Sequence, residues 1–167
     1  RFKKHKIEVA FKINPEHKEE LRIEADKLLS YVRKFEGLHP KNMASALKTI
    51  ANVSEHEKAF EILKEIYFIY INVNDNDLPS KKSIAFTCKS LTMHCRNKLA
   101  HFDESLKWAV EGLKWAHEIF KEDKNFSISS YYFFKGAALG ELRRFAEASV
   151  EFDLALNGIE PTSESSR

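Results

Sequence analysis

Apolar residues recur every three to four positions along most of the chain, which is the period of helices with a buried face. The four prolines stand at or near the ends of these periodic stretches. The pattern predicts an all-α chain of about seven helices, over residues 15–36, 40–52, 55–71, 80–99, 103–121, 127–142 and 145–157. A shorter stretch, 7–13, alternates apolar and polar residues and predicts an extended arm.

Capping signals set the expected helix ends. Asn14 precedes Pro15, Ser54 and Glu57 are spaced as a capping box, and Asp103 is expected to be the N-cap of the helix that follows it. The stretch "NVNDNDLPS" at 72–80 is the clearest loop. It lacks the EF-hand pattern, so we expect a polar loop without metal.

The predicted helix 103–121 has two apolar stripes. One contains Leu106, Ala109, Leu113, Ala116 and Phe120, and the other contains Trp108, Gly112, Trp115 and Ile119. A helix with two apolar stripes packs on both sides, which is typical of a middle helix in a stacked array.

The sequence repeats internally. Laying 98–113 over 141–156 pairs Leu99 with Leu142, Phe102 with Phe145 and Leu113 with Leu156, at an offset of 43 residues. A weaker third copy contains Lys58, Ala59, Leu63 and Ile66. Repeats of this length indicate a helical-repeat protein.

The last copy resembles a tetratricopeptide (TPR) repeat. The matching residues are Tyr132, Gly136 and Leu139 in its first helix, Phe145, Ala148, Phe152 and Ala155 in its turn and second helix, and Pro161, one residue late, at its end. The resemblance implies a right-handed superhelical array of antiparallel helix pairs. The domain limits expected from it are an N-terminal arm or linker (1–14), a TPR-like domain (15–160) and a polar tail (161–167).

TPR arrays bind an extended peptide or a partner helix along a concave face that the first helix of each repeat lines. The resemblance therefore implies a binding scaffold without catalysis. The groove positions that it implies are Lys41, Ser45, Lys48, Asn52, Ser90, His94, Asn97, Phe133, Phe134 and Ala137. The long repeats also resemble those of bacterial peptide-sensing regulators, whose TPR array follows a DNA-binding domain. Rigid scaffolding in a larger assembly is a third interpretation.

The stretch "RNKLAHF" at 96–102 supports a competing hypothesis, because it resembles the RNxxxH signature of HEPN ribonucleases. In that family the arginine stabilises a developing phosphorane and the histidine transfers protons, which on this chain implies Arg96 and His101, with Asn97 in support. The equivalent stretch "ELRRFAE" lacks a histidine, so the repeat favours an ordinary turn with a solvent-facing His101. Arg96 is the one position that the repeat does not explain.

Composition narrows the choice of partners. A net charge of +2 is small for a nucleic-acid-binding protein, so we expect nucleic-acid contact only through a domain outside this chain. A basic cluster at Arg1, Lys3, Lys4 and Lys6 is expected to be a solvated linker end, or else the edge of such a domain. Cys88 and Cys95 indicate reduced thiols of a cytoplasmic protein. No metal, cofactor or membrane span is expected, and a homodimer is compatible with the sequence.

Overall fold

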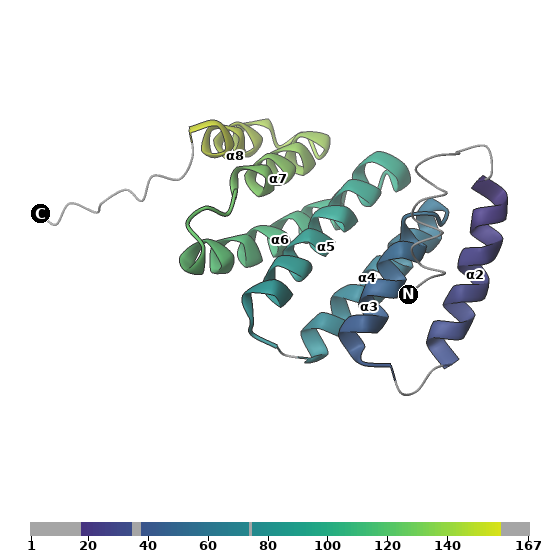
Figure 1. Cartoon of the computed structure of the whole chain (residues 1–167). Coiled ribbons are helices and arrows are strands. Elements are labelled where there is room, and N and C mark those ends of the chain that lie inside the picture. Colours follow the sequence, from purple (N-terminus) through teal and green to yellow (C-terminus); the bar gives the residue numbers. More distant parts are fainter. Residues whose placement is uncertain (1–17, 35–37, 74, 158–167) are drawn as a thin grey trace, which may run out of the picture. The chain divides into compact units, whose positions relative to one another are not determined.

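The computed structural model describes residues 18–34, 38–73 and 75–157, and it is all-α, as predicted. These residues form seven α-helices and one π-helical turn, with no strand among them, and within each of the chain's two compact units consecutive helices run antiparallel (Figure 1). The elements are α2 (Lys18–Lys34), α3 (Pro40–Ala51), α4 (His56–Val73), α5 (Leu78–His94), η2 (Cys95–Leu99), α6 (Phe102–Glu122), α7 (Ser129–Glu141) and α8 (Phe145–Asn157). The predicted arm at 7–13, the cap at Asn14 and the repeat-terminal Pro161 lie outside the described residues.

The structure differs from the sequence prediction at one helix start and at two predicted caps. The Asp77 carboxylate accepts from Ser80 N at 2.7 Å, so α5 begins at Leu78 and not at Ser80. The predicted capping box of α4 is not observed: the Ser54 hydroxyl instead donates to Ile50 O, at the end of α3, at 2.8 Å. Asp103 is not an N-cap either. It lies in the first turn of α6, where its negative charge interacts favourably with the positive end of the helix dipole.

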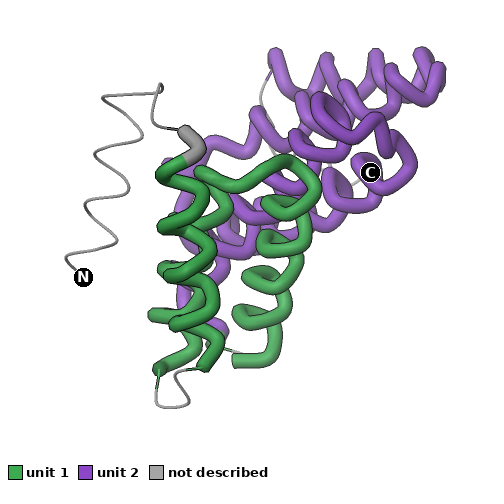
Figure 2. The backbone as a smooth tube through the Cα atoms, turned by 90° about the vertical axis from the view of Figure 1, so that its right-hand side faces the viewer, with its two compact units in different colours: residues 1–75 green, residues 76–167 purple. Residues whose placement is uncertain are grey.

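The chain divides into two compact units, residues 1–75 and 76–167 (Figure 2). In the first unit, α3 packs against both α2 and α4. Ala44, Leu47 and Ile50 form the buried face of α3. Arg33 on α2 forms an ion pair with Glu65 on α4 at 2.6 Å. These contacts make α2, α3 and α4 one packed group.

In the second unit, α6 packs between α5 and α7, as its two apolar stripes predict. Gly112 marks the closest approach. A Cβ built on it would lie 3.0 Å from Cys88 Cβ on α5 and 3.5 Å from Tyr131 Cδ1 on α7. Helix α8 packs in turn against α7. The core between these helices includes Ala85, Leu113, Ala116, Ile119, Ile128, Tyr131 and Tyr132.

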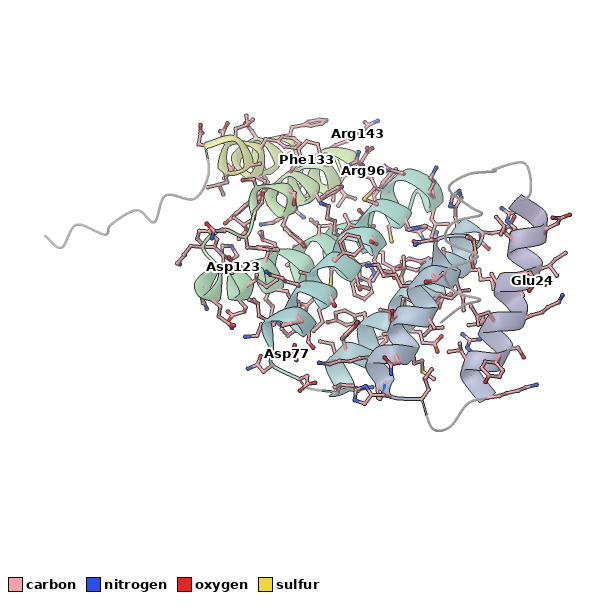
Figure 3. All side chains as sticks on the ribbon, in the orientation of Figure 1. Glu24, Asp77, Arg96, Asp123, Phe133 and Arg143 are labelled. Atoms are coloured by element: carbon pink, nitrogen blue, oxygen red, sulfur yellow. The ribbon has the colours of Figure 1, made fainter. Side chains whose placement is uncertain are left out.

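Two ion pairs fix the start of α5 to the end of α6. The amine of Lys81, which is buried, contacts Glu122, and the amine of Lys82 lies 2.8 Å from the Asp123 carboxylate (Asp123 is labelled in Figure 3). Each pair joins residues 41 positions apart. Because the opposite ends of these helices are joined directly by η2 and its turn, the α5–α6 pair is held at both ends.

Candidate functional site

The two helix turns of the second unit show the repeat in three dimensions. Ala100, after η2, and Arg143, after α7, both have left-handed backbones, with φ of 54° and 59°. They are 43 residues apart, the offset of the sequence repeat. Left-handed backbone is uncommon outside glycine and is typical of the residue that ends a helix.

The hydrogen bonds that close the two turns differ by one residue. After α7, Arg144 N donates to Leu139 O at 2.9 Å and Arg143 N donates to Gly140 O at 3.0 Å, which is the Schellman pattern. After η2, His101 N reaches back one residue further, to Cys95 O at 2.9 Å. The π-helical turn of η2 therefore contains one additional residue. Corresponding residues of the two copies are 43 positions apart after this turn and 44 positions apart before it.

The shifted register explains the position of Arg96. Buried Cys95 now corresponds to Leu139, and Arg96 corresponds to Gly140 instead of to a large apolar residue. Thr92 corresponds to Gly136, and each of these residues contacts the equivalent position of the next helix. The Ser105 hydroxyl donates to Thr92 O at 3.2 Å, while Gly136 lies beside the backbone of Ala148, the counterpart of Ser105.

An open hollow of about 600 Å³ lies beside these turns. Residues of η2, α7 and α8 line it, and all of them belong to the second unit. They are Arg96 from η2, then Phe133, Ala137, Gly140 and Glu141 from α7, and Phe145, Ala148, Ser149, Phe152 and Asp153 from α8. Arg96 and Phe133 are labelled in Figure 3.

Three phenylalanine rings dominate the apolar part of the hollow. Phe133 and Phe145 are 49% and 68% exposed, and Phe152 is half-buried. The rings of Phe133 and Phe152 are 5.6 Å apart between centroids. Exposed aromatic rings grouped around a concavity are typical of a protein-binding surface, because burying them releases much apolar area from water.

The charges around the hollow are only partly paired. Arg96 Nε lies 3.8 Å from Glu141 Oε1, which makes a long ion pair. Arg144 donates hydrogen bonds of 2.7 and 2.6 Å to Glu147, which lower the pKa of that carboxyl. Asp153 has no ion pair with any residue that the structure describes. The unmatched charge in the lining is therefore negative.

The structure places the ten predicted groove residues in both units. Lys41, Ser45, Lys48 and Asn52 lie on or just after α3, in the first unit. Of those in the second unit, only Phe133 and Ala137 line the hollow. Phe134 packs under the Lys89 amine, 5.1 Å from its ring centroid, and the Ser90 hydroxyl donates to Phe86 O. His94 is half-buried at the end of α5, and Asn97 is exposed in η2.

The sequence prediction missed the α8 side of the hollow. It assigned binding positions only to the first helix of each repeat, whereas Phe145, Ser149 and Asp153 come from the second helix of the last copy. A signal was present in the sequence. Phe145, Ser149, Phe152 and Leu156 follow one another at intervals of four, three and four residues, which places them on one stripe of the helix.

Only one of the three residues of the ribonuclease hypothesis lines the hollow. Arg96 lines it, but Asn97 and His101 do not, and both side chains are exposed. The prediction of a solvent-facing His101 is therefore confirmed. Arg96 and His101 stay a hypothetical catalytic pair, which an RNA cleavage assay tests directly.

Within residues 18–34, 38–73 and 75–157, no group of three or more His, Cys, Asp or Glu side chains is placed to hold a metal ion. None of the described helices is both long enough and apolar enough to cross a membrane.

No family model matches the chain, and no curated protein is significantly similar to it. The fold is similar to the crystal structure of BtubC (BKLC) from P. vanneervenii, with a TM-score of 0.50 and 13% sequence identity. The similarity covers 96% of this chain and 82% of BtubC. At this identity, the comparison concerns the fold.

Proposed function

We propose that this protein is a binding scaffold that holds a peptide or a segment of a partner protein in the hollow of its second unit. The observation that carries the proposal is the group of three phenylalanines around an open concavity. Phe133 and Phe145 together expose large apolar surfaces that nothing in the described chain covers. Interfaces concentrate their binding energy in aromatic residues of this kind.

The shape of the hollow favours side chains of a macromolecular ligand. It is open to solvent and is walled by two helices and a turn, so it offers little enclosure to a small molecule. A side chain that projects from a peptide needs enclosure only at its tip. The resemblance of the last repeat to the TPR family supports the same class of ligand.

Well-packed helices form most of the site. Helix α7 ends in a complete Schellman turn that leads into α8, and the two helices are in contact at Gly136 and Ala148. A site on rigid helices loses little conformational entropy when a ligand binds.

The test is a selection of linear random peptides on the purified protein, followed by affinity measurements on three forms of it. Ser149→Arg places a large charged side chain in the hollow at an exposed position, so it should weaken selected peptides by about tenfold or more, equivalent to ~1.4 kcal/mol. Val150→Arg is the matched control, because it adds the same side chain to the same helix outside the lining.

Wild-type affinity in Val150→Arg and loss in Ser149→Arg support the proposal. Circular dichroism checks that both variants are folded. If no peptide is selected, or if Ser149→Arg binds all selected peptides as well as the wild type does, the hollow is not the binding site.

A further inference from the structure

We infer that the ligand of the hollow is an amphipathic helix with an apolar stripe flanked by lysine or arginine. This inference rests on the proposed function and adds the conformation and the chemistry of the partner. It comes from the spacing of residues on α8 and from the charge of the lining.

The face of α8 that lines the hollow has the residue spacing of a helix-packing seam. Phe145, Ala148, Ser149 and Phe152 are at positions i, i+3, i+4 and i+7, and all four line the hollow. Four residues at these positions form the hole that accepts one side chain of a facing helix. The two central members are small and the two outer members are aromatic, so the hole has apolar ends and a centre of small side chains, of which Ala148 is buried.

A second hole follows along the same helix. Ser149, Phe152, Asp153 and Leu156 repeat the i, i+3, i+4, i+7 spacing, and the Leu156 side chain is 82% exposed. Two successive holes accept two apolar side chains that are three or four residues apart on a partner helix. An extended peptide places neighbouring same-face side chains two residues apart, which does not match this spacing.

Helix α7 supplies the other wall. Phe133, Ala137 and Gly140 lie at positions i, i+4 and i+7 and face the same hollow. Ala137 and Gly140 are small, so a helix seated on α8 is able to approach the α7 backbone closely. This arrangement is the helix-in-groove mode of recognition, in which apolar anchors follow the i, i+3, i+4, i+7 rule.

The charge of the lining selects the flanking residues of the partner. Arg96 and Glu141 form an ion pair with each other, whereas Asp153 has no cation partner among the described residues. Asp153 borders the second hole, so a lysine or arginine next to the apolar stripe of the partner reaches it. Charge complementarity of this kind sets the orientation and specificity of a partner more than its affinity.

The experiment compares two displayed peptide libraries of about 18 residues, a length that supports an isolated helix. One library has a helix-favouring host sequence, and the other has prolines that prevent helix formation. We expect the helical library to give binders with apolar residues at i, i+3 or i+4, and i+7, flanked by lysine or arginine. An isotope-labelled binder should show helical Cα chemical shifts along its apolar stripe when it is bound.

Two substitutions then test the contacts. Ser149→Arg should weaken these binders by about tenfold or more, and Val150→Arg should leave them unchanged. Asp153→Lys should weaken binders with flanking lysine by about three- to tenfold. Changing that lysine of the peptide to glutamate should restore its affinity for the Asp153→Lys variant.

Each alternative outcome overturns a different statement. Binders from the proline library that Ser149→Arg weakens would refute the helical partner and leave the proposed function intact. Helical binders that prefer flanking glutamate on the wild type would refute the charge assignment. Binders that ignore Ser149→Arg would refute both proposals. A concentration-dependent dimer in light scattering that Ser149→Arg abolishes would show that a second copy of the chain is the occupant.

Discussion

Gly136 on α7 lies in close contact with α8, and its replacement by alanine tests the packing of the two helices. A Cβ at this position would lie 2.9 Å and 3.0 Å from Cε1 and Cδ1 of Phe152, and 3.2 Å from the Ala148 carbonyl oxygen. The Phe152 ring already packs against Phe133, 5.6 Å away between centroids, and the Ala148 carbonyl belongs to the backbone. Gly140, on the same helix, has nothing within 4 Å of the equivalent Cβ position.

The two glycines therefore separate helix propensity from packing. Alanine in place of glycine stabilises a helix by roughly 0.5–1 kcal/mol. Overpacking costs about 1–3 kcal/mol, and it applies at Gly136 only. We expect Gly140→Ala to stabilise the second unit slightly, and Gly136→Ala to be less stable than Gly140→Ala by about 1–3 kcal/mol.

Urea unfolding followed by tryptophan fluorescence measures this difference. The only two tryptophans of the chain, Trp108 and Trp115, are both in α6, so the signal reports on the second unit. Phe152→Leu combined with Gly136→Ala should recover part of the loss, because the ring that the new methyl group contacts is gone. Equal stabilisation by Gly136→Ala and Gly140→Ala would refute the close approach of the two helices.

Three other predictions follow from individual contacts. The wild-type chain should not cleave RNA, and a reproducible cleavage lost in both Arg96→Ala and His101→Ala, with folding intact, would establish the enzyme instead. The Cys88 thiol is buried, and burial raises its pKa well above the ordinary value, so a thiol reagent at pH 8 should label it only as fast as the unit unfolds. Lys135→Met should destabilise the second unit by about 1–3 kcal/mol in urea unfolding, since it leaves the Glu151 carboxylate buried without its 2.6 Å cation partner. Adding Glu151→Gln should restore much of this stability, and no recovery would contradict the explanation.

The helices were predictable because their signal is distributed over many residues. Each buried face repeats with the helical period, so single errors do not change the assignment, and α8 has the predicted bounds 145–157. The helix starts were less predictable because a single hydrogen bond decides each of them. Asp77 and Ser80 are both good capping residues, and the sequence does not show which one the backbone N–H groups will face.

The lining of the hollow was only partly predictable, for a different reason. The repeat register assigned Phe133 and Ala137 to an accessible face of the first repeat helix, and both residues line the hollow. Whether the stripe of Phe145, Ser149 and Phe152 faces solvent depends on what packs beyond α8. That is a property of the tertiary arrangement, since the same apolar spacing in the sequence predicts a buried face equally well.

The turn at η2 shows that two copies of a repeat can keep equivalent buried residues while the adjacent, accessible residue differs between them. No residue type in "RNKL" distinguishes a π-helical turn from an α-helical one, so an alignment at constant offset pairs Arg96 with buried Leu139. With the additional residue counted, buried Cys95 takes that place, and Arg96 pairs with Gly140, which lines the same hollow. The buried contacts fix which residues must match between the copies. The next position, which faces the hollow, is free to be an arginine in one copy and a glycine in the other, and this difference puts a charge in a lining that is otherwise largely apolar.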